Sequence, residues 1–225
     1  MKIKPTTESD ATPAQVAAQM EAEIHALPAP STNTVRTIRR SYSKQLAHVD
    51  APFLLELAHA LIDQFQQRWL AYELIRYHKA AFGMLGATEL EALGQGINSW
   101  DTVDAFARIL TGPAWLHGQL SDATIHQWAL STDLWWRRTA LVSTVALNMR
   151  SQGGKGDVAR ALAICELLVA DHEDMVVKGL SWALRELVVH DAIAVETFLA
   201  THEEVLAARV KREVRNKLTT GLKNP

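Results

Sequence analysis

The hydrophobic residues of this chain recur with a helical period along nearly its whole length. Leu54, Leu57, Ala58, Leu61 and Ile62 form one such run, and residues at this spacing share one face of a helix with about 3.6 residues per turn. The strict alternation of apolar and polar residues that marks a half-buried strand is absent. Capping residues and prolines separate the runs and predict helices over 13–27, 31–48, 52–66, 68–83, 87–95, 99–110, 121–130, 133–149, 157–170, 173–189, 191–201 and 203–220. The sequence therefore predicts an all-α protein.

Short links join these helices, which favours antiparallel helix pairs stacked side by side. Stacked pairs form an α-solenoid with a concave face. Residues 139–147 are apolar almost all round, as expected of an inner helix that neighbours cover on both sides. We expect a flexible N-terminal tail over residues 1–12 and a single helical-repeat domain over residues 13–225. A compact helical bundle without repeats is the alternative.

Composition limits the classes of function. The chain has 225 residues, of which 48% are hydrophobic, and this is enough for a substantial core. Its formal net charge of −2 excludes a uniformly basic nucleic-acid binder, so any affinity for DNA must come from local patches. Cys165 is the only cysteine, and its apolar neighbours predict an inert buried thiol. The histidines lack ligand spacing, so we expect no metal and no cofactor.

The sequence also indicates where the protein works. Its longest apolar stretches are shorter than the roughly 18–20 residues that a transmembrane helix needs. Residues 1–13 contain no apolar run of the kind found in a signal peptide. We therefore expect a cytoplasmic monomer, in the bacterial cytosol or nucleoid, that has no contact with a membrane.

Three segments place a tryptophan beside charged residues. They are Ser99–Asp104, Leu134–Ala140 and Lys178–Glu186. On a helix, Trp100 and Asp104 are i, i+4 neighbours, while Lys178, Trp182 and Arg185 fall on one stripe. A surface that holds a polyanion and presses aromatic faces against a cation or a sugar would use such residues.

Each segment also has a purely structural alternative. A carboxylate in the first turn of a helix is stabilised by about 0.3–1 kcal/mol, and this alone would account for Asp104. For Arg137 and Arg138 the structural alternative is a side chain that simply extends to the surface, whereas in the functional interpretation one reaches a groove and the other faces solvent. Gly179 indicates that something approaches closely, and the alternative is a helix–helix contact with Trp182 covering a neighbouring helix.

Together the three segments resemble the AlkD-type DNA alkylation-repair glycosylases. The similarity lies in Trp-Asp-x-x-Asp at 100–104, in Trp-Trp-Arg-Arg-Thr-Ala at 135–140 and in Lys-Gly-Leu-Ser-Trp-Ala-Leu-Arg-Glu at 178–186, and it extends over roughly residues 30–220. The resemblance implies HEAT-like repeats and a substrate of double-stranded DNA with cationic alkylated purines. It also implies that Asp104 is the catalytic carboxylate, that Trp100 and Trp182 flank it, and that Arg138 grips a phosphate.

The chemistry suits these residue types. Alkylation makes the purine a cationic leaving group, so the sugar left behind is oxocarbenium-like and a carboxylate such as Asp104 can stabilise it or position water. Tryptophan faces add cation–π attraction of about 0.5–2 kcal/mol each. Arg137, Lys178 and Arg185 are further candidate DNA contacts.

The N-terminal region supplies a second cationic stripe. Arg36, Arg40 and Lys44 lie at i, i+4 and i+8 with Arg39 beside them, and they form either a phosphate-binding surface or an ordinary solvated face. The family's N-terminal helices usually carry an aromatic residue followed by a Gly-x-x-x-Pro-type turn. That turn is absent here, and Tyr42 is the candidate to replace the aromatic residue.

The resemblance thus implies a glycosylase that hydrolyses the N-glycosidic bond of purines such as 3-methyladenine and 7-methylguanine, in base excision repair. Two alternatives stay open. One is a non-catalytic relative that binds the DNA backbone, and the other is a helical-repeat scaffold for protein partners whose tryptophans are core or interface residues.

Overall fold

The computed structural model describes residues 11–225, and every regular element in this range is helical. Most of the predicted N-terminal tail, residues 1–10, lies outside the described residues. Thr12 already belongs to the fold, because its side chain accepts a hydrogen bond from the backbone N–H of Gln15 and caps the first helix. The contacts divide the chain into two compact units, 1–84 and 85–225. The single domain expected over 13–225 stays a prediction.

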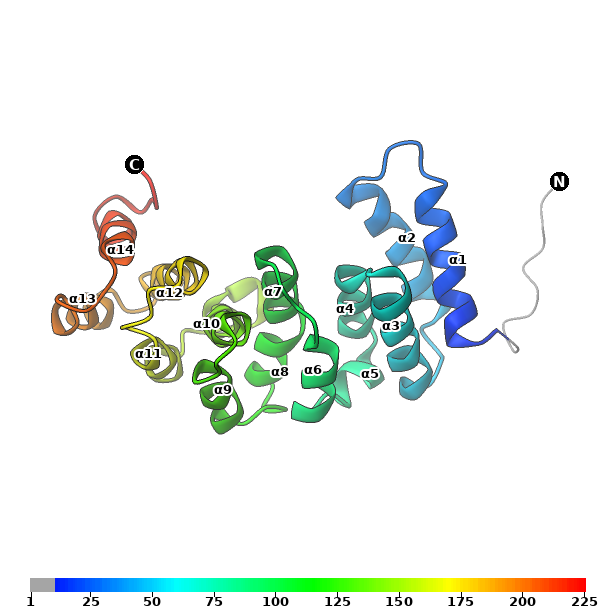
Figure 1. Ribbon diagram of the computed structural model, residues 1–225, viewed down its shortest axis with the longest axis horizontal. Helices are drawn as coiled ribbons and strands as arrows, with labels where there is room; N and C mark the ends of the chain where they lie inside the picture. Colours follow the sequence, from blue (N-terminus) through cyan, green and yellow to red (C-terminus); the bar gives the residue numbers. More distant parts are fainter. Residues whose placement is uncertain (1–10) are drawn as a thin grey trace. The chain divides into compact units, whose positions relative to one another are not determined.

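Unit 1, the part of the chain up to Met84, is built from helices α1 to α5. They are α1 (Pro13–His25), α2 (Thr32–Gln45), α3 (Ala51–Phe65), α4 (Arg68–Tyr77) and α5 (Lys79–Gly83). Helix α3 packs between α1 and α4, and α4 also contacts α2 (Figure 1). Fully buried residues from α1, α3 and α4, including Met20, Leu61 and Leu74, form its core.

Unit 2, from Leu85 onward, holds the remaining helices. They are α6 (Ala87–Gly94), α7 (Trp100–Phe106), the π-helical turn Ala107–Thr111, α8 (Gly112–Leu116), α9 (Asp122–Ala129), α10 (Leu134–Asn148), the short 3-10 turn Arg150–Gln152, α11 (Val158–Leu167), α12 (Asp174–Leu187), α13 (Ala192–Thr201) and α14 (Ala208–Thr220). Helix α10 packs against α8 and α12, α12 packs against α14, and α9 packs against α11 (Figure 1). Such contacts between alternate helices make an α-solenoid, as the sequence predicts.

Helix α10 is the inner helix of this stack. Its residues from Arg138 to Asn148 are all buried, and α7, α8, α9, α11 and α12 all contact it. The apolar run at 139–147 therefore has the covered position that was predicted. Asp133 caps the helix, since its carboxylate accepts a hydrogen bond from the backbone N–H of Trp135 at 2.8 Å.

Helix α7 continues beyond its predicted end. The sequence predicted a helix that stops at 110, but the chain passes through a π-helical turn into α8 and ends at Leu116. Pro113 explains the π turn, because it has no N–H to donate and its ring would clash with the carbonyl four residues earlier. Gly112 has no Cβ, which lets it keep helical angles directly before a proline.

Two further predictions of helix extent were wrong. The helix expected over 68–83 breaks at His78, whose backbone is extended and whose Nδ1 accepts a hydrogen bond from the N–H of Ala81. The helix expected over 203–220 begins only at Ala208. Cys165 is fully buried in α11, as predicted, and burial raises the pKa of its thiol. Within residues 11–225, none of the helices combines the length and apolar character needed to cross a bilayer.

Candidate functional site

Asp104 and Arg138 form an ion pair that joins α7 to α10. The Nε of Arg138 donates to Oδ1 of Asp104, and its Nη2 donates to Oδ2, both at 2.9 Å. The Arg138 side chain is 6% exposed and that of Asp104 16% exposed. A bidentate contact of this kind fixes the orientation of the carboxylate.

Arg138 also reaches α12. Its third nitrogen, Nη1, donates to the backbone carbonyl of Met175 in the first turn of that helix. A Cβ placed on Gly179, one turn further along α12, would lie 3.6 Å from Cγ of Arg138 and 3.4 Å from a methyl group of Leu141. Gly179 is therefore a helix–helix contact with α10. Arg138, which belongs to α10, therefore binds α7 and α12 at once. These contacts fix the Asp104 side chain relative to α10 and α12.

The two tryptophans lie on the two helices that Arg138 connects to α10. Trp100 opens α7 one helical turn before Asp104 and is 57% exposed. Trp182 lies on α12, and its indole N–H donates to Glu186 at 3.0 Å. The guanidinium of Arg108 lies over the Trp182 ring, 5.6 Å from its centre. We call Trp100, Asp104, Arg108, Arg138 and Trp182 the Asp104 cluster.

Arg108 is the member of the Asp104 cluster that the sequence analysis missed. It lies one turn beyond Asp104, in the π-helical stretch, and its Nε is buried with no hydrogen-bond partner among the described residues. The signal was present in the sequence, since residue 108 follows Asp104 at the same spacing at which Asp104 follows Trp100.

Arg137 binds other partners than Arg138 does, in the loops before α10 and α12. Its Nε donates to Asp171 at 2.7 Å, and its Nη1 donates to the carbonyls of Ser131 and Thr132 at 3.0 Å each. These contacts tie the start of α10 to the loop before it and to the loop before α12. The guanidinium thus has protein partners here, and its contact with DNA stays a prediction.

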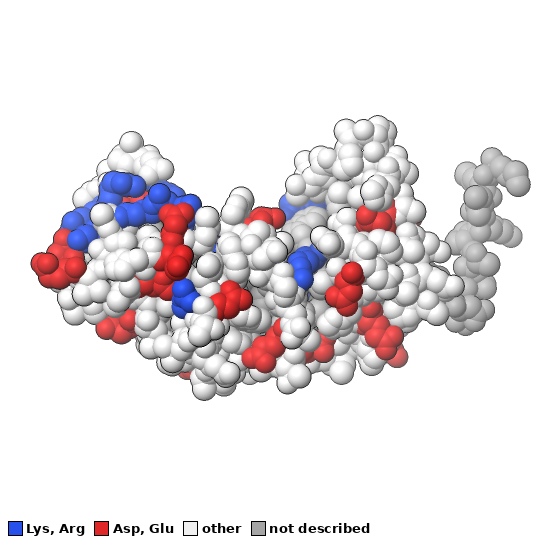
Figure 2. All heavy atoms as spheres, viewed as in Figure 1, with Lys and Arg blue, Asp and Glu red and all other residues white. Residues whose placement is uncertain are grey.

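Lys178 and Arg185 lie on α12 with Trp182, as the stripe predicted, and both have acidic neighbours. Lys178 pairs with Asp174 at 2.6 Å, and this hydrogen bond lowers the pKa of the Asp174 carboxyl. Arg185 donates to Ser181 at 3.2 Å and lies 4.0 Å from Glu213, while burial lowers its own pKa. Figure 2 shows Lys and Arg side chains gathered over α12 and α14.

The four N-terminal cations belong to unit 1 and fall into two groups. Arg36 and Arg39 both bind Glu73 of α4, at 3.2 Å and 2.9 Å, and Arg39 is buried. Arg40 and Lys44 are exposed. Arg40, Lys44 and Arg36, whose side chain is 40% exposed, have the surface position that a phosphate contact requires. For Arg39 the expected surface position is wrong, because a buried carboxylate holds it inside.

Tyr42 was the candidate to replace the family's N-terminal aromatic residue. Its ring is buried in unit 1, and its hydroxyl donates to Glu23 at 2.8 Å. Burial, together with this carboxylate, raises the pKa of the Tyr42 hydroxyl. Tyr42 is thus a packing residue of α2, and the structure gives it no face to offer a ligand.

Comparison with known proteins adds one finding. A family model described as DNA alkylation repair enzyme matches residues 9–218, a range that contains the whole Asp104 cluster. Searches of curated proteins and of solved structures found no match. Because the matched range covers nearly all of the sequence, the chain belongs to the DNA alkylation repair enzyme family.

Proposed function

We propose that this protein is a DNA glycosylase that removes cationic alkylated purines, such as 3-methyladenine and 7-methylguanine, from duplex DNA. The observation that carries the proposal is the Asp104 carboxylate, held in place by a bidentate contact with Arg138 one turn from an exposed tryptophan. A fixed negative charge beside an aromatic face suits a reaction in which positive charge develops on a sugar.

In the proposed reaction the bond between the purine nitrogen and C1′ of the deoxyribose breaks. The bonding electrons pass to the alkylated purine, which leaves as a neutral base, and the sugar becomes oxocarbenium-like. Asp104 stabilises this charge and orients the water that attacks C1′, and the proton of that water goes to solvent. Trp100 and Trp182 pack against the sugar or the cationic base.

The direct test is to incubate the protein with methylated duplex DNA and to identify the freed bases by chromatography. We expect 7-methylguanine and 3-methyladenine to appear at a rate that increases with protein concentration. Heat-denatured protein serves as the control for spontaneous depurination. Release no faster than this control would contradict the proposal.

One observation favours a second candidate function. Both oxygens of Asp104 accept hydrogen bonds from Arg138, as in an ion pair with a structural role. A non-catalytic relative that binds the DNA backbone would keep this pair and release no base. It would show salt-dependent binding to duplex DNA of any sequence, because phosphate contacts release counterions.

Replacing Trp100 by alanine tests whether its indole ring contributes to base release. Trp100 is exposed, so we expect the free energy of unfolding to change by less than about 0.5 kcal/mol. We expect base release to slow by roughly 2- to 30-fold, which corresponds to a lost cation–π contact of about 0.5–2 kcal/mol. Single-turnover assays on methylated duplex DNA give the rate, and urea titration gives the stability.

The matched control for this variant is Ile193→Ala. Ile193 is an exposed apolar residue of α13, outside the Asp104 cluster. We expect this change to leave the rate of base release unaltered. Equal rates of base release for the Trp100→Ala variant and the wild type would show that Trp100 takes no part in catalysis.

A further inference from the structure

Arg108 is a cation without an anion beside the ion pair of Asp104. Its Nε is buried and has no hydrogen-bond partner among residues 11–225, and no carboxylate in that range pairs with it. A buried N–H without an acceptor destabilises the fold, and more so when the group is charged, so such a group calls for an explanation.

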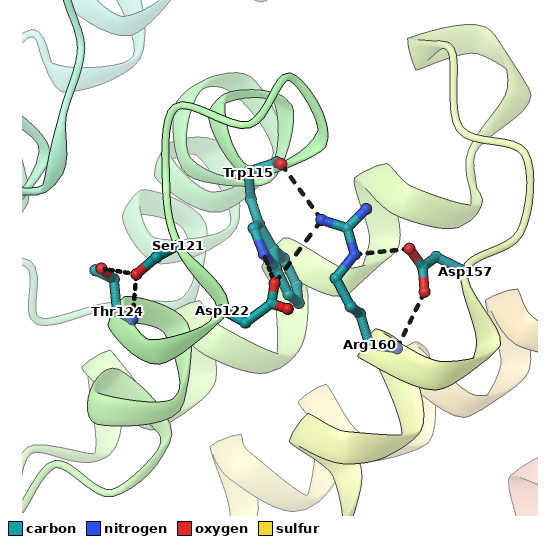
Figure 3. Close-up of polar contacts among 6 residues, drawn as sticks. All are labelled: Trp115, Ser121, Asp122, Thr124, Asp157 and Arg160. Atoms are coloured by element: carbon teal, nitrogen blue, oxygen red, sulfur yellow. Dashed lines mark hydrogen bonds and ion pairs between the residues drawn. The ribbon is translucent and has the colours of Figure 1, made fainter.

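Arg160 is a second arginine that lies over a tryptophan ring, and it also has acidic partners. Its guanidinium lies over the ring of Trp115, 5.0 Å from the centre, much as Arg108 lies over Trp182. Arg160, however, also pairs with Asp157 at 2.6 Å and with Asp122 at 3.9 Å (Figure 3). Arg108 has the aromatic support and lacks the acids.

Arg138 is poorly placed to bind an external anion. Three of its N–H groups already donate to Asp104 and to the carbonyl of Met175. Its side chain is nearly covered, whereas that of Arg108 is partly accessible to solvent. Only two N–H groups of Arg138 stay uncommitted for an external anion.

We propose that Arg108 binds a backbone phosphate next to the damaged nucleotide, and that Arg138 acts as the positioning residue for Asp104. This inference rests on the proposed function, because it takes duplex DNA as the ligand. A guanidinium binds two phosphate oxygens at once, and the guanidinium of Arg108 already lies over the Trp182 ring. The phosphate supplies the anion that the Arg108 guanidinium lacks and places the deoxyribose beside Asp104.

Salt dependence of DNA binding tests this assignment. Binding of an undamaged duplex is measured by fluorescence anisotropy at salt concentrations from about 50 to 300 mM, for the wild type and for Arg108→Gln. We expect the slope of log affinity against log salt to decrease by about one unit, since one phosphate contact is lost. Arg108→Lys keeps the charge, so its slope should match the wild type while its affinity decreases.

Arg160→Gln is the matched control. It also removes an arginine that lies over a tryptophan in unit 2, but one whose anions belong to the protein. We expect its slope to equal that of the wild type. If Arg108→Gln has the wild-type slope as well, the assignment of Arg108 to a phosphate is wrong, and the proposed glycosylase function is unaffected.

A second measurement leaves the protein unchanged. Single phosphates on either side of a 7-methylguanine are replaced one at a time by neutral methylphosphonates. One replacement should weaken binding of the wild type and have no further effect on Arg108→Gln. Equal weakening of both proteins at every position overturns the inference. A wild-type protein that binds duplex DNA but releases no base overturns the glycosylase and leaves the Arg108 contact supported by its slope. If the wild type binds no duplex at all, both proposals are wrong.

Discussion

Replacing Asp104 by asparagine should slow base release from methylated duplex DNA by about 100-fold or more, while affinity for the duplex changes little. Asparagine keeps the shape of the side chain and one acceptor for Arg138, but it removes the negative charge. Loss of a single group that stabilises transition-state charge typically costs about 10²–10³ in rate. Single-turnover release of 7-methylguanine gives the rate, and fluorescence anisotropy gives the affinity.

Asp171→Asn is a control matched in position and burial. Asp171 pairs with Arg137, the residue directly before Arg138, and its side chain is about as well covered as that of Asp104. Both variants weaken an ion pair of α10, so both should lose stability, up to the roughly 3–5 kcal/mol that breaking a buried pair costs. Only Asp104→Asn should lose activity. If base release by that variant stays within a few-fold of the wild type, Asp104 is not the catalytic carboxylate.

Replacing Gly112 by alanine should destabilise unit 2 by about 1–3 kcal/mol, because overpacking forces neighbouring backbone apart. A Cβ at this position would lie 2.7 Å from Cβ of Ala146 and 2.8 Å from the carbonyl oxygen of Ser143, both on α10. Neither atom can turn away, since one is fixed to the helix backbone and the other belongs to it. Gly112 also precedes Pro113, where any Cβ disfavours helical angles. Urea unfolding, followed by circular dichroism, measures the change.

Gly179→Ala is the counterpart on the other side of α10. There the new Cβ would meet Leu141 and Arg138 at 3.4 Å or more, which is ordinary contact. Alanine is more favourable than glycine in a helix interior by about 1 kcal/mol, so this variant should be slightly more stable than the wild type. If the two variants changed stability by the same amount, the packing on the two sides of α10 would not differ as described.

The features of the fold that depend on local sequence could be predicted. Ser31, Asp50, Ser121 and Asp133 each cap a helix at the expected point, because a cap needs only its own side chain and the next turn. The break at His78 could not be predicted, since there a histidine ring nitrogen acts as the cap. The passage from α7 into α8 was also missed, because Gly112-Pro113 is typical of a helix end.

The candidate site could be predicted only in part. The family motifs indicated Asp104 and Arg138 as site residues, and the two form an ion pair although 34 residues separate them. Sequence patterns could not show which acid each arginine meets, because that depends on the packing of distant helices. Arg39 meets the buried Glu73, and Arg137 meets Asp171. Arg108 follows Asp104 at a helical spacing, but its unpaired Nε–H donor appears only when all its neighbours are in place.

The burial of Cys165 has a consequence for a protein exposed to methylating chemicals. Such electrophiles attack sulfur as well as DNA, and the reactive form of a cysteine is its thiolate. The one thiol of this chain is enclosed in α11, and burial raises its pKa, so it stays protonated and out of reach. The compounds that create the proposed substrate therefore find no cysteine to inactivate in the folded protein.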